Sequence, residues 1–327
     1  MIKLHLPAPL CALKTCARRY LRLPLHTAAL VCALLAQPAL AFEAQNYCGE
    51  EGVWIQILGS GGPELNDNTA SASYLVWQDG KARVLIDPAP GSSLLFDLAQ
   101  ARYEDLEAVL ISNLNVHHVG DLPAFIKGAQ FADRTEPLRI FGPDGEAPYP
   151  GTTQFIERLI GPDGAFAYLA PSLEVKAMGK RIVPQDIPAK GRRVWARFGT
   201  ETLQIAAVPV NHGSVPALAY RITMGDQTLV FSGNFNNEKD TLVAFAEGAD
   251  ALVLHHAIPE SARGAARELD VRPSQIGRIA SRIDPNFLIL GHRTNRTRGV
   301  ESLTRNAIEE TYLGDVLFGS DLECWGL

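Results

Sequence analysis

Short apolar runs in this chain fall into two groups, and helix-forming segments follow each group. The first group begins at Val53–Leu58 and the second at Thr202–Val210. Asp79-Gly80 separates two runs of the first group, and this dipeptide is typical of a tight β-hairpin. Each sheet must bury one apolar face, so two groups of strands with helices fit two packed sheets with helices outside. The pattern therefore predicts an α/β fold.

A less regular segment, residues 151–197, separates the two groups of strands. It contains one helix candidate, Thr153–Ile160, and several Pro and Gly residues that interrupt regular structure. We expect this segment to be an insertion or a lid that belongs to a single domain of residues 42–327. No short-period repeat indicates a second domain.

The first 41 residues have the composition of an export signal. They contain five basic residues and no acidic one, and an apolar run covers Thr27–Ala36. Ala39-Leu40-Ala41 is the small-x-small pattern of a cleavage site, so we expect a mature chain that begins at Phe42 and is periplasmic or secreted. The alternative is a retained membrane anchor, although the run is short for a span. Arg18-Arg19 leaves twin-arginine export open.

Removal of this leader makes the charge balance more acidic. The whole chain has 30 basic and 36 acidic residues, a net charge of −6. The leader holds five of the basic residues, which leaves 25 against 36 and a net charge of −11. Such a surface repels phosphate backbones, so we expect a small-molecule substrate and no nucleic-acid partner. No further apolar run is long enough for a span, so we expect no membrane association after cleavage.

Only two of the five cysteines, Cys48 and Cys324, lie beyond the leader. In an oxidising compartment this pair indicates a disulfide that joins the two ends of the mature chain. The alternative is two free buried thiols. Neither cysteine belongs to a C-x-x-C pattern, so we do not expect them to bind a metal.

Six of the eight histidines lie beyond the leader, and each one closely follows a predicted strand. They are His117, His118, His212, His255, His256 and His292. Loops at strand ends commonly carry functional residues. A lone histidine is usually structural, but six in such loops indicate a metal-binding or catalytic role for at least three. His255 and His256 are consecutive in a strand, so we expect one of them to face the site.

The segment Ile111–Phe125, ISNLNVHHVGDLPAF, resembles the H-x-H-x-D-H loop of metallo-β-lactamase-fold hydrolases, particularly the ribonuclease Z and arylsulfatase-like branch. Five other segments match the family in the same order, namely Ile57–Pro63, Leu85–Gly91, Val210–Ile222, Phe231–Asn234 and Leu290–His292. The resemblance covers nearly all of the mature chain. It implies the family's four-layer αββα sandwich.

The family's usual site holds two metals with seven ligand positions. In this chain those positions carry, in order, Asn113, Asn115, His117, His118, His212, Asn234 and His292. The first metal's positions correspond to Asn113, Asn115 and His212. The second metal's positions correspond to His117, His118 and His292, and Asn234 takes the place of the bridging Asp. Four of these residues, which we call the altered motif positions, depart from the family: Asn113, Asn115, His117 and Asn234.

These departures favour one metal over two. Asn is a poor zinc ligand, so the first half-site is expected to be empty. His117, His118 and His292 resemble the ligand set of a mononuclear catalytic zinc site, although another divalent metal is possible. His212 would then be a catalytic residue that donates a proton opposite the metal, or a residue that supports a ligand without binding the metal itself.

Three functions remain open at this point. The first is an exported, mononuclear hydrolase of a phosphodiester, sulfate ester, lactone or similar ester. The second is a non-catalytic protein of this fold that has lost the dinuclear centre and binds a metal or a small molecule. The third is an iron enzyme with oxidative chemistry, which is disfavoured because the matching positions lack a carboxylate.

Overall fold

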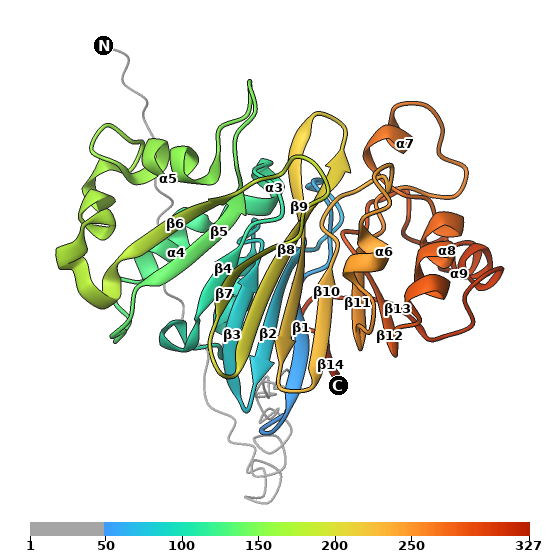
Figure 1. The fold of residues 1–327 in the computed structure, drawn as a ribbon, viewed down its shortest axis with the longest axis horizontal. Helices are drawn as coiled ribbons and strands as arrows, with labels where there is room; N and C mark the ends of the chain where they lie inside the picture. The colour runs from blue at the N-terminus through green and yellow to red at the C-terminus, as the bar shows by residue number, and fades with distance from the viewer. Residues whose placement is uncertain (1–48) are drawn as a thin grey trace, which may run out of the picture. The chain divides into compact units, whose positions relative to one another are not determined.

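A computed structural model describes residues 49–327 of the chain (Figure 1). The predicted leader, residues 1–41, and Cys48 lie outside the described residues. The signal peptide, the export and the disulfide between Cys48 and Cys324 therefore stay predictions. In the described part, no helix is long and apolar enough to cross a membrane.

The first sheet has seven strands in the order β14-β1-β2-β3-β4-β5-β6. The strands are β1 (Val53–Gly59), β2 (Ser73–Gln78), β3 (Lys81–Ile86), β4 (Ala108–Leu110), β5 (Leu138–Pro143), β6 (Ile182–Ile187) and β14 (Cys324–Gly326). β1 pairs with β14 and β2 in antiparallel register, and so does β2 with β3, whereas β3 to β6 are parallel. Asp79 and Gly80, with φ of 49° and 70°, form the predicted turn between β2 and β3.

The second sheet also has seven strands, in the order β13-β12-β11-β10-β9-β8-β7. The strands are β7 (Trp195–Gly199), β8 (Leu203–His212), β9 (Val215–Met224), β10 (Gln227–Phe231), β11 (Ala251–His255), β12 (Phe287–Gly291) and β13 (Val316–Phe318). β7 to β10 are antiparallel, and β10 to β13 are parallel. Each sheet thus combines an antiparallel half with a parallel half.

Helices cover the outer faces of both sheets (Figure 1). On the first sheet these are α2 (Ser92–Leu98), η1 (Tyr103–Asp105), α3 (Val116–Val119), α4 (Leu122–Gly128), α5 (Thr152–Ile160), η2 (Ala167–Leu173) and η3 (Val175–Lys180). The helices that connect β10 to β13 of the second sheet are α6 (Leu242–Phe245), α7 (Ala266–Leu269), α8 (Pro273–Ile283) and α9 (Glu301–Glu309). The predicted αββα sandwich is confirmed.

Alternation of side chains along the strands builds three apolar layers. In β1, Ile55 and Ile57 point into the layer between the sheets, whereas Leu58 points to the outer layer under the helices. Tyr220 of β9 enters the inner layer from the other sheet, and Ile276 of α8 closes the outer layer of the second sheet. Burial of these surfaces is the main favourable term in folding, and it fixes which strand ends face one another.

The irregular middle segment contributes to both sheets. Besides α5 it contains β6 and β7, which lie at the edges of the first and second sheets. Pro184 lies within β6, where an edge strand tolerates the missing N–H. The sequence alone does not indicate β6 and β7, because neither has a long apolar run, nor β13 and β14, which have three residues each. A lid function for residues 151–197 stays a prediction.

Candidate metal centre

Asp87 joins the loop after β3 to the loop after β4. Its carboxylate accepts hydrogen bonds from the backbone N–H and the hydroxyl of Ser112, both at 2.7 Å. His118 Nδ1 lies 2.8 Å from Asp87 Oδ2. Asp87 is fully buried and has a φ of 52°, a costly conformation that is often found at functional sites. A carboxylate on one ring nitrogen is the usual way to orient a histidine whose other nitrogen binds a metal.

Three histidines converge next to this anchor. Helix α3 places His117 and His118 in succession, and His292 follows β12 with a φ of 52°. Their ligand nitrogens all lie within 4.8 Å of one another, and within residues 49–327 this is the one group of three or more His, Cys, Asp or Glu side chains that lies so close together. Both nitrogens of His292 are buried without a hydrogen-bond partner. Such orphaned atoms are costly, and a metal ion would satisfy one of them.

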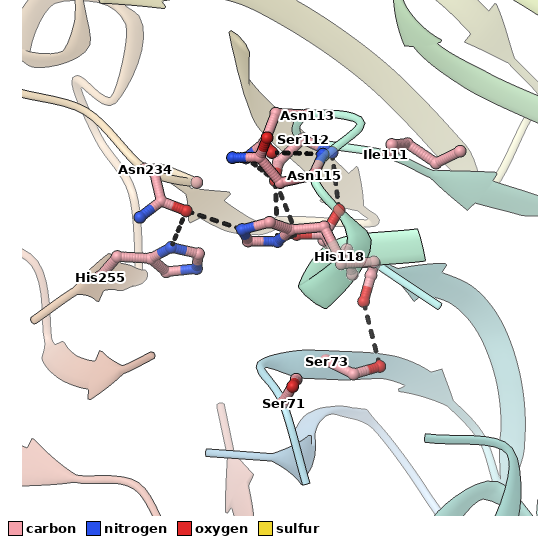
Figure 2. Close-up of polar contacts among 12 residues, drawn as sticks. Ser71, Ser73, Ile111, Ser112, Asn113, Asn115, His118, Asn234 and His255 are labelled. Carbon is pink, nitrogen blue, oxygen red and sulfur yellow. Dashed lines mark hydrogen bonds and ion pairs between the residues drawn. The ribbon is translucent and has the colours of Figure 1, made fainter. Parts of the chain in front are cut away.

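Each ring nitrogen of His118 faces an oxygen atom that can only accept a hydrogen bond. Nδ1 faces Asp87, and Nε2 lies 2.8 Å from Asn234 Oδ1 (Figure 2). Asn234 Nδ2 donates to Asp270 Oδ1 at 2.9 Å, so the amide oxygen is the end that faces His118. A neutral imidazole carries one N–H, and if it donates to Asp87, then Nε2 directs a lone pair at another lone pair. A cation beside both atoms removes this conflict, so the donor set fits a metal ion.

Burial lowers the pKa of three imidazoles at the site, those of His117, His255 and His292, and keeps them neutral at pH 7. Burial, reinforced by the neighbouring His118, lowers the pKa of His117 to about 3. Burial also lowers the pKa of His255 and that of His292 well below the ordinary value. A metal binds the neutral imidazole, so His117 and His292 are in the ligating form without losing a proton first.

His255 and His256 point to opposite faces of the second sheet, as alternation along β11 requires. The ring of His255 stacks on His292, with centroids 4.6 Å apart, and its Nδ1 lies 3.2 Å from Asn234 Oδ1 (Figure 2). His256 instead lies 3.3 Å from the hydroxyl of Thr304 through Nε2. Of the two histidines, His255 therefore faces the site, a choice that the sequence alone did not decide.

The positions of the family's first metal do not form a ligand group. Asn113 Oδ1 accepts the backbone N–H of Asn115 at 3.0 Å and so closes a local turn. His212 Nδ1 lies 2.8 Å from the carbonyl oxygen of Leu269, to which it donates. With Asn113 used in a turn and His212 held by another loop, these side chains do not fit a second metal.

Comparison with known proteins agrees with this architecture. The model of the beta-lactamase superfamily domain matches residues 82–293. Ribonuclease Z of Pyrococcus horikoshii is 28% identical over 187 residues, 57% of this chain and 51% of that protein, so the chain spans about half the length of this relative. Ribonuclease Z of Anoxybacillus flavithermus is 24% identical over 310 residues, 82% of this chain and 95% of that protein.

Two solved structures show the same fold. The metallo-beta-lactamase fold protein YhfI from Bacillus subtilis has a TM-score of 0.65 and 19% identity, over 84% of this chain and 98% of that one. The short form of human tRNase Z has a TM-score of 0.64 and 15% identity, over 84% of this chain and 98% of that one.

The expectation of a small-molecule substrate and no nucleic-acid partner is contradicted by these comparisons, because the matched relatives are ribonucleases. Net charge averages over the whole surface, whereas phosphate recognition depends on the charge at the site. A divalent ion supplies that positive charge even in an acidic protein. Because the family model covers more than half of the chain, this chain belongs to the beta-lactamase superfamily.

Proposed function

We propose that this protein is a phosphodiester hydrolase that uses one divalent metal ion, with Zn²⁺ as the first candidate. The observation that carries the proposal is the convergence of His117, His118 and His292, together with the two buried nitrogens of His292 that lack a hydrogen-bond partner. Three neutral imidazoles are a known ligand set of mononuclear catalytic zinc. Zinc prefers nitrogen donors, whereas Mg²⁺ and Ca²⁺ prefer oxygen, so the cluster favours zinc.

A bound zinc ion supplies a polarising charge for the phosphoryl oxygen and lowers the pKa of a coordinated water. The protein's own residues prepare the ligands. Asp87 holds Nδ1 of His118, which leaves Nε2 for the ion, and His255 packs against the ring of His292. These contacts fix the rings before a metal arrives, so little ordering entropy opposes binding.

His212 is the proposed proton-transfer residue. Its Nδ1 donates to the carbonyl of Leu269, which leaves Nε2 as the nitrogen that can accept a proton. Burial lowers the pKa of His212, so the side chain is neutral at pH 7 and can act first as a base. His212 is the last residue of β8 and is not a member of the three-histidine cluster.

The substrate that the relatives favour is a phosphodiester in RNA, since they are ribonucleases. A sulfate ester or a lactone is the alternative for the same polarising centre. We also propose that the mature protein is exported, on the basis of its leader sequence. Cell fractionation of a C-terminally tagged chain tests this part separately, and a full-length cytoplasmic product would contradict it.

The function is tested by metal analysis and turnover on the purified protein. We expect about one zinc per chain, with hydrolysis of a transfer-RNA precursor or of bis(p-nitrophenyl) phosphate. His118→Ala and His292→Ala should lose both metal and turnover, whereas His212→Gln should keep the metal and lose turnover. His256→Gln is the matched control, because His256 points away from the cluster, and it should keep both.

The outcomes separate the candidate functions. A purified protein that has no bound metal and shows no turnover would refute the proposal. One zinc without turnover on phosphodiester, sulfate ester or lactone substrates would favour a metal-binding protein that has lost catalysis. That second candidate is favoured by one observation, the use of Asn113 Oδ1 in a local turn where the family has a metal ligand.

A further inference from the structure

We propose that Asp270 is a positioning residue that fixes the carboxamide of Asn234 with its oxygen toward the metal, and that this oxygen is a further ligand beside the three histidines. The inference rests on the proposed metal centre. Asp270 lies in the segment between α7 and α8, outside the motif segments that match the family.

The backbone brings Asn234 close to the cluster. Gly233, directly before it, has a φ of 58°, and a Cβ atom there would lie 2.9 Å from Ser112 Cβ and 3.0 Å from the carbonyl oxygen of Leu218. Only glycine allows this close approach without strain. The tight turn therefore places the buried Asn234 side chain against the loop that carries His118.

Each end of the carboxamide has a different partner. Nδ2 donates to Asp270 Oδ1 at 2.9 Å. Oδ1 lies 2.8 Å from His118 Nε2 and 3.2 Å from His255 Nδ1 (Figure 2). A carboxamide has two ends of nearly the same shape, but only the oxygen can bind a cation. A carboxylate has no such ambiguity, so the replacement of the family's bridging Asp by Asn creates a need for an orienting partner.

Asp270 meets this need because its carboxylate can only accept from the amide. It is mostly buried, so water does not readily replace it. Without Asp270, the amide group can turn and direct Nδ2 at His118 Nε2, where two hydrogens would oppose a cation. Partners that orient a metal ligand typically change metal affinity by about 10- to 100-fold when they are removed.

The test measures Co²⁺ affinity in two backgrounds, by titration of the chelator-treated full chain and by the visible absorption of bound Co²⁺. With Asn234 present, Asp270→Leu should weaken Co²⁺ binding about 10- to 100-fold and change the absorption spectrum. With Asn234→Asp, where both ends are oxygens, Asp270→Leu should cause no loss of affinity. Asp270→Ala gives the same comparison if the leucine variant does not fold.

Asp250→Leu is the matched control. The carboxylate of Asp250 accepts a hydrogen bond from the backbone N–H of Thr228, at the other end of β10, at 2.7 Å. Its loss should lower the melting temperature and leave Co²⁺ affinity unchanged. If Asp270→Leu causes an equal loss of Co²⁺ affinity with Asn234 and with Asn234→Asp, Asp270 is merely structural. No loss of affinity in either background would also overturn the inference. If the unaltered protein binds no Co²⁺, the proposed function itself fails.

Discussion

Replacing Asp87 by Asn should weaken metal binding with little effect on the fold, because it changes which nitrogen of His118 carries the proton. Asp87 Oδ1 accepts the backbone N–H of Ser112, and Oδ2 accepts the Ser112 hydroxyl and faces His118 Nδ1. The Ser112 N–H cannot turn away, so the oxygen of the new carboxamide must take the place of Oδ1. The amide NH₂ then faces His118 Nδ1, which must accept. The proton moves to Nε2, where Asn234 Oδ1 accepts it.

The magnitudes follow from these contacts. The Ser112 hydroxyl can reorient and accept, so each polar group keeps a partner, and only the charge assistance of three hydrogen bonds is lost. We expect the free energy of unfolding of the metal-free protein to fall by about 1–3 kcal/mol. Metal affinity should fall at least about 10- to 100-fold, since Nε2 of His118 no longer offers a lone pair.

Asp87→Ala is the contrasting variant. It leaves Ser112 and His118 with unsatisfied buried groups, each at a cost of about 1–3 kcal/mol, so it should be clearly less stable than Asp87→Asn. Urea unfolding measures the stability, and Co²⁺ titration measures the affinity. A folded Asp87→Asn protein with unchanged Co²⁺ affinity would refute the idea that Asp87 sets the tautomer of His118.

Three further predictions concern the motif, a buried histidine and the chain ends. Restoring the family's His or Asp at all four altered motif positions should raise the zinc content from about one to about two per chain, by elemental analysis. Burial and the neighbouring Arg293 lower the pKa of His256 to about 3, so the folded state resists its protonation. Stability of the metal-free protein should therefore fall as the pH drops from about 6.5 to 3, by at most about 1.4 kcal/mol per pH unit from this group, and His256→Gln should reduce that slope in urea titrations. If Cys48 and Cys324 form a disulfide, the mature protein should show no reactive thiol under denaturing, non-reducing conditions, and Cys324→Ser should lower the melting temperature; two reactive thiols would contradict this.

Local sequence signals predicted the helices and strands whose bounds depend on residues close together in the chain. The sequence predicts a helix over Pro273–Ile283, and α8 has these bounds, because Pro273 suits the first helical position and Asp284 ends the helix in a left-handed conformation. Strands with buried apolar runs were also found. The edge strand β6 was not, because its hydrogen bonds to β5 depend on long-range pairing, which no periodicity within Ile182–Ile187 reveals.

The site residues, too, were predicted only in part from the sequence. The resemblance predicted that His117, His118 and His292 belong together, and the structure brings their nitrogens within 4.8 Å. Alternation along β11 limited the choice to His255 or His256 but could not select one. Asp270 gave no signal, because its role arises from a contact with Asn234, 36 positions earlier in the chain.

A crystal structure with anomalous diffraction measured at the zinc edge tests the central claim most directly. We predict one anomalous peak per chain, about 2.0–2.1 Å from a nitrogen of each of His117, His118 and His292. Two peaks, a peak at His212, or none in zinc-supplemented crystals would contradict it.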